Sequence, residues 1–264
     1  MTWPLALHQP GDPPSPYALR MLGGFQLDIG GRRYDIALGS QRLLAFLALN
    51  RRPLLRSHVA GVLWPDVGDR RAAGNLRSAL WRLPLPWHVV TEGPYGTLQL
   101  DALVGVDLES ATTLAKRWID GTAAEDDTAQ SLVMLQEDLL PDWYDDWVDA
   151  HRERFRQLRL HGLEAMAQQL SREGRFGEAA QAALAAVEGD PMRESAQRAL
   201  INVHVAEGNT VEALRQVRRF ERILRDELGI TSSGLADLIP SPPRRAIPLP
   251  RAGRQAPSHR RGTL

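Results

Sequence analysis

The sequence contains no cysteine and only one lysine, Lys116. Without cysteine the chain has no disulfide, no zinc–thiolate site and no thiol nucleophile. No glycine is followed by lysine, which excludes a Walker A phosphate loop. No apolar run reaches the roughly 18 residues that a membrane helix needs, and no basic segment precedes an apolar run at the start of the chain. These absences predict a cytoplasmic protein without a membrane anchor.

Residues suited to catalysis are present but do not form a recognisable site. The histidines are scattered, without metal-ligand spacing or a triad partner. One acidic cluster, at 140–149, holds Asp142, Asp145, Asp146 and Asp149. Adjacent aspartates at the start of a helix complement its positive end, and no histidine pair or glycine loop accompanies them. We therefore expect no enzyme activity, no catalytic residues, no metal and no cofactor.

Charge is distributed unevenly along the chain although the total is balanced. Residues 1–100 hold 11 basic and 6 acidic side chains, residues 101–240 hold 15 and 26, and residues 241–264 hold 6 and 0. A basic first part suits nucleic acid, and an acidic second part suits protein partners. The proline-rich residues 1–16 predict a disordered leader, and residues 239–264, rich in proline and arginine, predict a disordered basic tail.

The periodicity of apolar residues changes several times in the first hundred positions. Alternating apolar residues over 17–38, interrupted by glycine pairs, predict a small antiparallel sheet. Helical spacing follows over 40–50 and 57–64, with Ser40 and Ser57 as expected N-caps. After a further helical segment, residues 87–100 predict a β-hairpin with a Gly-Pro-Tyr-Gly tip. This order is typical of a winged helix-turn-helix domain, which we place at 17–103.

The third helical segment, 69–83, carries the strongest binding signal. One face is apolar, formed by Ala72, Ala73, Leu76, Ala79, Leu80 and Leu83. The remaining circumference carries Arg70, Arg71, Asn75, Arg77, Ser78, Trp81 and Arg82. Arginine binds phosphates or guanine, and asparagine binds adenine. We therefore expect this helix to enter the major groove of double-stranded DNA; the alternative is an ordinary solvated helix.

The spacing suggests roles for individual side chains. Arg71 and Ser78 lie most directly opposite the expected apolar stripe and are the candidates for base contacts, while Arg70, Arg77 and Arg82 are candidates for phosphate contacts. Asn75 completes the expected DNA-binding set on the helix, and Tyr95 and Thr97 at the hairpin tip would contact the neighbouring backbone or minor groove. Trp81 either touches a thymine methyl or packs on a neighbouring element; packing is favoured because large aromatics are usually buried.

An internal repeat begins after residue 148. Glu173-Gly174 recurs as Glu207-Gly208, and Glu178-Ala179 recurs as Glu212-Ala213, each 34 residues later. A period of 34 with helical content is the signature of tetratricopeptide repeats. The expected packing positions are Leu163, Met166, Ala167, Leu170, Ala179, Ala183, Ala186, Gln197, Leu200, Ile201, His204, Ala213, Val217 and Phe220. The predicted fold is mainly α with a small β component: a winged helix-turn-helix domain, then an all-α tetratricopeptide-like domain at 104–238.

Several motifs together resemble the antibiotic regulatory protein family of actinomycetes. They are Trp64-Pro-Asp66, Asn75-Leu-Arg-Ser-Ala-Leu-Trp-Arg-Leu83, Leu140-Pro-Asp-Trp-Tyr-Asp-Asp-Trp147 and Arg222-Ile-Leu-Arg-Asp-Glu-Leu-Gly229. The resemblance implies an OmpR-type winged helix joined to a bacterial transcriptional activation domain. It further implies a transcriptional activator that binds promoter direct repeats as a homodimer on DNA and contacts RNA polymerase. One departure is the Arg82–Trp87 link, where two prolines are expected to end the recognition helix at Leu83.

A second class of function is left open by the residues themselves. The acidic second half suits protein partners, so the chain is alternatively a helical-repeat adaptor whose winged helix binds protein rather than DNA. Salt-dependent DNA binding would distinguish the two, because phosphate contacts release counterions.

Overall fold

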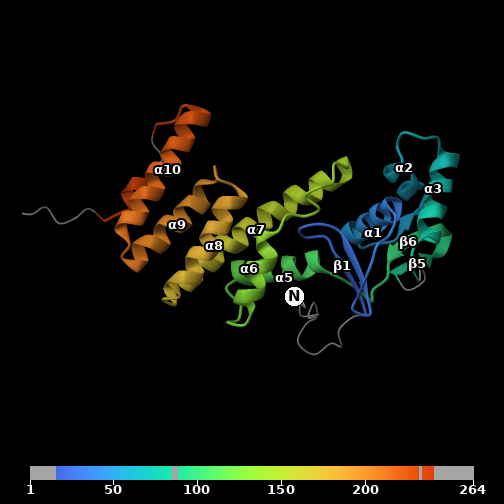
Figure 1. Ribbon diagram of the computed structural model, residues 1–264, viewed down its shortest axis with the longest axis horizontal. Coiled ribbons are helices and arrows are strands. Elements are labelled where there is room, and N and C mark those ends of the chain that lie inside the picture. The colour runs from blue at the N-terminus through green and yellow to red at the C-terminus, as the bar shows by residue number, and fades with distance from the viewer. Residues whose placement is uncertain (1–15, 85–88, 232–233, 241–264) are drawn as a thin grey trace, which may run out of the picture.

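The computed structural model describes residues 16–84, 89–231 and 234–240. The molecule is elongated, with the sheets and first helices at one end and the later helices stacked along the long axis (Figure 1). The expected disordered leader and basic tail fall almost entirely on residues 1–15 and 241–264, outside the described residues. Among the described residues, the helices are too short or too polar to cross a membrane.

The N-terminal sheet has the strand order β3-β2-β1-β7. Its strands are β1 (Tyr17–Arg20), β2 (Gln26–Ile29), β3 (Arg32–Tyr34) and β7 (Val104–Val106). Gly30 and Gly31 both have positive φ in the two-residue turn between β2 and β3, a conformation that glycine adopts without strain. The first three strands are antiparallel as expected, whereas β7 joins parallel to β1, with Tyr17 opposite Val104.

The winged helix-turn-helix domain adds a helical layer and a second sheet of order β4-β6-β5. Its elements are α1 (Leu38–Asn50), β4 (Leu54–Leu55), α2 (Arg56–Leu63), α3 (Asp69–Trp81), β5 (Val90–Gly93), the 3-10 turn η1 (Pro94–Gly96) and β6 (Thr97–Leu100). The expectation that Ser57 caps the second helix is wrong. Leu55 is the N-cap, because β4 pairs with β6 and continues directly into α2.

The rest of the described residues are mainly helical. They comprise α5 (Asp107–Ile119), α6 (Asp127–Gln136), α7 (Asp146–Arg172), α8 (Phe176–Gly189), α9 (Glu194–Glu207), α10 (Thr210–Leu228) and the 3-10 turn η2 (Leu235–Leu238). The pairs α7–α8 and α9–α10 form the predicted repeat, with Gly174 and Gly208 in positive-φ turns between their helices. The expected packing positions are buried, except that His204 is half-buried. The repeat predicted from the 34-residue period is confirmed.

Aromatic and acidic side chains of residues 140–147 pack against the first domain. The Trp147 ring meets Phe46 of α1 edge-on, with centroids 5.1 Å apart, and Trp143 stacks on Phe25 at 5.9 Å. Arg152 of α7 donates hydrogen bonds to the carbonyl oxygens of Leu139, Leu140 and Trp143. Asp145 pairs with Arg42 of α1. This segment therefore joins the helical body to the winged domain.

Candidate nucleic-acid interface

Helix α3 has one buried face and one exposed face. Gly68 precedes it in an extended conformation, and Asp69 lies in the first turn, where a carboxylate is favourable beside the helix N-terminus. The residues buried along it are Ala72, Leu76 and Ala79, and Leu83 is buried just beyond its end. The helix ends at Trp81, two residues before the end expected from the following proline. Its exposed face is left free for a partner.

Ser40 anchors α3 to α1. The side chain of Ser40 is fully buried, and its hydroxyl donates a 2.7 Å hydrogen bond to the carbonyl oxygen of Ala79. The expectation that Ser40 is an N-cap is wrong, because α1 already begins at Leu38 after the extended residue Ala37. A buried hydroxyl needs a hydrogen-bond partner, and for Ser40 that partner is a carbonyl oxygen of α3. The bond helps to fix the rotation of α3 about its own axis.

The buried stripe of α3 is narrower than the sequence pattern suggested. Ala73 and Leu80 are only half-buried. At 100° per residue, the face most directly opposite the buried residues is therefore centred on Gly74 and Trp81 rather than on Arg71 and Ser78. The predicted DNA-binding residues Arg70, Arg71, Arg77, Ser78 and Arg82 are exposed, and Asn75 is half-buried. Arg70 and Arg77 lie on one side of this outward axis, and Arg71 and Ser78 lie on the other.

Trp81 is the most unusual residue on this face. Its side chain is 89% exposed, so the expectation that it packs against a neighbouring element is wrong. Trp81 lies in the last turn of α3 on the outward side, beyond the reach of the core that covers Leu76 and Ala79. An exposed indole on a basic helix suits contact with the apolar parts of a nucleic acid, its deoxyribose and thymine methyl groups.

The hydroxyl of Ser78 is partly used within the helix. It donates a 3.1 Å hydrogen bond to the carbonyl oxygen of Gly74, one turn earlier. The oxygen lone pairs remain as acceptors. Ser78 can therefore accept a hydrogen bond from a base amino group without breaking this contact.

The predicted hairpin is confirmed over residues 90–100 as the wing of the domain; residues 87 and 88 of the predicted span lie outside the described residues. Strands β5 and β6 pair antiparallel, from Val90 opposite Leu100 to Gly93 opposite Thr97. Thr91 donates a hydrogen bond to Asp101, which holds the base of the hairpin. The tip, η1, follows Gly93, where a Cβ would lie 2.5 Å from the Thr97 hydroxyl.

The two candidate residues at the wing tip differ in availability. Tyr95 is 96% exposed, so its ring points away from the body. Its φ of 59° is positive, a backbone conformation that is rare for a bulky residue. Thr97 is half-buried, and its hydroxyl donates a 3.1 Å hydrogen bond to the carbonyl oxygen of Pro94. Tyr95 is thus open to a ligand, whereas Thr97 stabilises the turn that presents it.

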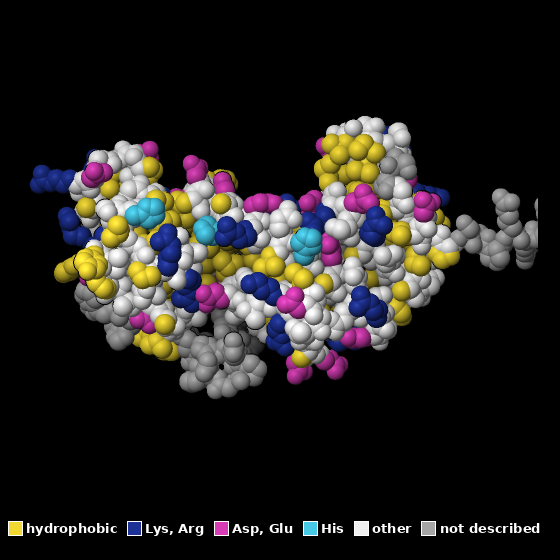
Figure 2. Space-filling model, turned by 180° about the vertical axis from the view of Figure 1, so that it is seen from behind, with side chains coloured by type: hydrophobic (Ala, Val, Ile, Leu, Met, Phe, Trp, Pro, Cys, Tyr) yellow, Lys and Arg dark blue, Asp and Glu magenta, His cyan; other side chains and the backbone are white. Residues whose placement is uncertain are grey.

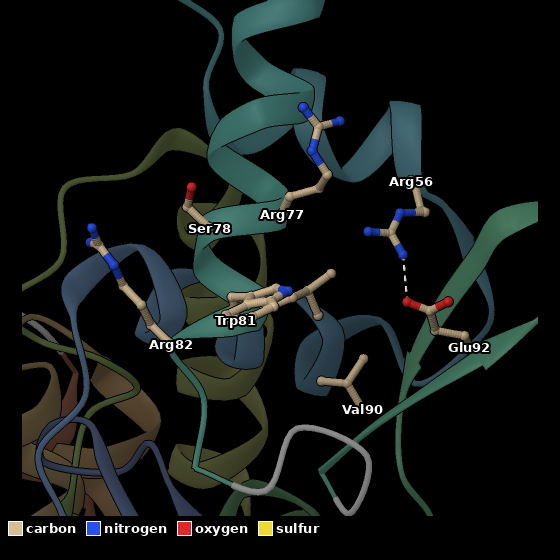
Figure 3. Close-up of a pocket in the computed structure, with 8 residues that line it drawn as sticks. Arg56, Arg77, Ser78, Trp81, Arg82, Val90 and Glu92 are labelled. Atoms are coloured by element: carbon tan, nitrogen blue, oxygen red, sulfur yellow. Dashed lines mark hydrogen bonds and ion pairs between the residues drawn. The ribbon is translucent and has the colours of Figure 1, made fainter.

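A groove with a volume of about 830 Å3 runs between α3 and the wing. Its lining includes Arg77 and Trp81 from α3, Val90 and Glu92 from β5, and Arg56 from the start of α2. Arg77 and Trp81 extend toward the wing side of the helix (Figure 3). Ser78 and Arg82 also line the groove, but in this view they extend from the other side of α3. The structure thus brings together basic side chains from two helices.

Arg56 was missed by the reading of the sequence. Its Nη1 lies 2.5 Å from a carboxylate oxygen of Glu92 across the groove (Figure 3). Arg56 also lines a second groove, about 570 Å3 in volume, between α2 and the first half of α3. The sequence did contain a signal for Arg56: it is a basic residue next to Ser57, at the expected start of the second helix. In a helix-turn-helix this helix start lies close to the ligand.

The charges match the division of the sequence. Basic side chains project from the end of the molecule formed by α3, at the left of Figure 2, while basic and acidic side chains are mixed along the helical body. Within the described residues, histidines and carboxylates do not gather into a cluster that could hold a metal ion. The basic end suits binding to a long polyanion.

Comparison with known families decides what kind of protein this is. Residues 100–236 match the model described as the bacterial transcriptional activator domain, more than half of the chain. The chain belongs to this family. The matched activator domain begins in β6, includes β7 and α5 to α10, and ends within η2. The family assignment agrees with the resemblance to antibiotic regulatory proteins found in the sequence motifs.

The fold of this activator-domain protein is also found among solved structures. It is similar to a chain described as Mycobacterium tuberculosis EmbR in complex with a low-affinity phosphopeptide, with 20% sequence identity and a TM-score of 0.63. The match covers 85% of this chain and 64% of the EmbR chain, so this protein spans less than two thirds of that one. At this identity the comparison establishes the fold alone. A comparison with curated proteins gave no match.

Proposed function

We propose that this protein is a sequence-specific DNA-binding transcriptional activator. The observation that carries the proposal is the exposed basic face of α3, on a winged domain that packs against a bacterial transcriptional activator domain. In this arrangement α3 enters the major groove, and Tyr95 at the wing tip approaches the adjacent minor groove. The winged domain spans 17–103 and the helical domain 104–238, with the leader and tail outside them.

The division of labour within α3 follows from its rotation. Gly74 and Trp81 face the DNA most directly, so the backbone approaches the groove floor at Gly74, which has no side chain of its own. Arg70 and Arg71 near the N-terminal end reach base edges and adjacent phosphates, since the first turns of a recognition helix lie deepest. Arg77 and Arg82 hold phosphates, and Asn75 and Ser78 complete the interface.

The helical body supplies the regulatory contact. It holds 26 acidic against 15 basic side chains over residues 101–240, and Trp143 and Trp147 pack it against the winged domain. Two copies on a direct repeat therefore present two acidic bodies in the same orientation beside a promoter, where they contact RNA polymerase. Neither copy needs to dimerise away from the DNA.

Fluorescence anisotropy on DNA duplexes tests the DNA-binding half of the proposal. The full chain is titrated against genomic promoter fragments at increasing salt, beside the triple variant Arg70→Ala, Arg71→Ala, Arg77→Ala. The matched control replaces Arg218, Arg219 and Arg222, exposed on α10, with alanine and so removes the same charge. We expect the first variant to lose binding and the control to retain it. Equal loss in both, or no DNA binding by the wild type, would refute the proposal and favour the protein-binding adaptor.

Transcription in vitro tests the activating half. RNA polymerase and a template carrying the bound fragment upstream of a promoter are combined with the wild type or the triple α3 variant. We expect more transcript with the wild type and no increase with the variant. A decrease in transcript with the wild type would identify a repressor instead.

A further inference from the structure

The ion pair between Arg56 and Glu92 occupies the groove where a DNA strand would cross. Their side chains are 31% and 47% exposed, and the pair joins α2 to the wing. We propose that Arg56 is a further phosphate-binding residue, and that Glu92 lowers the affinity for DNA by holding Arg56 in this pair. The inference rests on the proposed function, since it concerns the same surface.

The position of Arg56 follows from the shape of the domain. When α3 lies in the major groove and the wing reaches the next minor groove, the sugar–phosphate strand between the two grooves passes over the space between α3 and the wing. Arg56 and Arg77 line that space from two different helices; Figure 3 shows the Arg56 guanidinium directed toward Glu92 and that of Arg77 extending back along α3. Trp81 and Val90 give it an apolar floor suited to a deoxyribose. A phosphate at this place therefore has two cationic partners.

Glu92 is the acidic residue that lines the same groove. A carboxylate facing a phosphate is repulsive, and it competes with the phosphate for Arg56. The pair is accessible to water, where an ion pair contributes little to stability, so Arg56 can exchange its carboxylate partner for a phosphate. Glu92 then sets how much Arg56 contributes to binding, on every sequence alike, because phosphate contacts carry no base information.

The test is a double-mutant cycle on DNA affinity. Arg56→Gln is expected to weaken binding about fivefold near 0.15 M salt, on a bound promoter fragment and on scrambled DNA alike, and to reduce the slope of log K against log salt by about one. Glu92→Gln is expected to strengthen binding by a similar factor on both duplexes. In the double variant the gain from Glu92→Gln disappears, because Glu92 acts through Arg56.

A matched control is available on α9. Glu194 and Arg198 form a pair at 2.6 Å with side chains 52% and 49% exposed, far from the winged domain. Glu194→Gln releases an arginine in the same way and is expected to leave DNA affinity unchanged. Thermal unfolding of each variant confirms that it is folded.

The possible outcomes separate this inference from the proposed function. If the α3 triple variant loses binding while Arg56→Gln and Glu92→Gln change neither affinity nor salt slope, the inference is wrong and the proposed function stands. A gain from Glu92→Gln that persists without Arg56 also overturns it, since Glu92 would then act by direct repulsion. If the wild type does not bind DNA, both fail together.

Discussion

The carboxylate of Asp107 accepts hydrogen bonds from the backbone N–H of Met21, with both oxygens at 2.9 Å, across 86 residues of sequence. The N–H of Leu22 donates to the same carboxylate at 2.9 Å. Asp107 is the first residue of α5, and Met21 follows β1 directly, so the contact joins the activator domain to the N-terminal sheet. This joint helps to hold the helical body in a fixed relation to α3.

Replacing Asp107 with asparagine is expected to destabilise the protein by about 1–3 kcal/mol, because one backbone N–H would lose its acceptor and meet an amide N–H instead. Urea unfolding of the full chain measures the change. Asp66→Asn, at an exposed loop position, serves as the control. Equal free energies of unfolding for wild type and Asp107→Asn would mean that the joint contributes nothing.

The same residue predicts a dependence of stability on pH. Burial raises the pKa of Asp107 from its ordinary 3.8 to about 6, against the opposing effect of its backbone hydrogen bonds and of Arg20. Between these pH values the folded protein holds this proton more tightly than the unfolded chain does. The contribution of Asp107 to the free energy of unfolding therefore falls as pH rises from about 4 to about 6 and is constant above. Subtracting the pH profile of Asp107→Asn from that of the wild type isolates it; a difference that rises over this range would contradict the shift.

Trp81→Ala is expected to separate binding from stability. The indole is almost fully exposed, so the free energy of unfolding changes by less than about 0.5 kcal/mol. DNA affinity falls by about 1 kcal/mol, because the indole no longer covers apolar parts of the duplex. Trp118, buried with its indole N–H donating to Ser131, gives the contrast: Trp118→Ala costs about 3–5 kcal/mol of stability. A loss of stability in Trp81→Ala as large as that would show that Trp81 packs after all.

Gly74→Ala is expected to act in opposite directions on folding and on binding. Gly74 lies inside α3, and an added Cβ would meet only the Arg77 side chain at 3.8 Å, so alanine stabilises the helix by about 0.5–1 kcal/mol. The same methyl group stands on the outward axis and keeps the helix backbone away from the groove floor. Thermal unfolding and anisotropy on one preparation measure both effects. Unchanged DNA affinity would show that α3 does not approach DNA through Gly74.

Arg71→Ala tests the assignment of base contacts. If Arg71 binds a base edge, the variant loses about 1–3 kcal/mol on a bound promoter fragment and much less on scrambled DNA. Arg77→Ala, on the same helix, is the comparison for a phosphate contact. An equal loss on both duplexes would make Arg71 a phosphate contact as well.

Features set by local periodicity could be predicted from the sequence. The buried residues Ala72, Leu76 and Ala79, the hairpin ending at Leu100 and the 34-residue repeat through Gly174 and Gly208 all follow from spacing along the chain. In each case the pattern of apolar or glycine residues extends over a few turns or a fixed repeat, so it can be recognised without knowing which residues are neighbours in space.

Features that depend on distant contacts could not be predicted. Strand β4 has two residues, too few for a periodic pattern, yet it sets where α2 begins. The partner of Ser40 lies 39 residues away and that of Arg56 lies 36 residues away. Trp81 was expected to pack against a neighbouring element because large aromatics usually do. It is exposed instead, because it lies on the outward side of the last turn of α3.

In vitro selection from a pool of random DNA duplexes tests the central claim most directly. The wild-type chain and the variant lacking Arg70, Arg71 and Arg77 are incubated with the pool at near-physiological salt, and retained duplexes are sequenced. We expect the wild type to enrich one short motif repeated in direct orientation, and the variant to enrich none. No enrichment by the wild type, or the same motif enriched by both proteins, would contradict the assignment of α3 as the element that reads DNA.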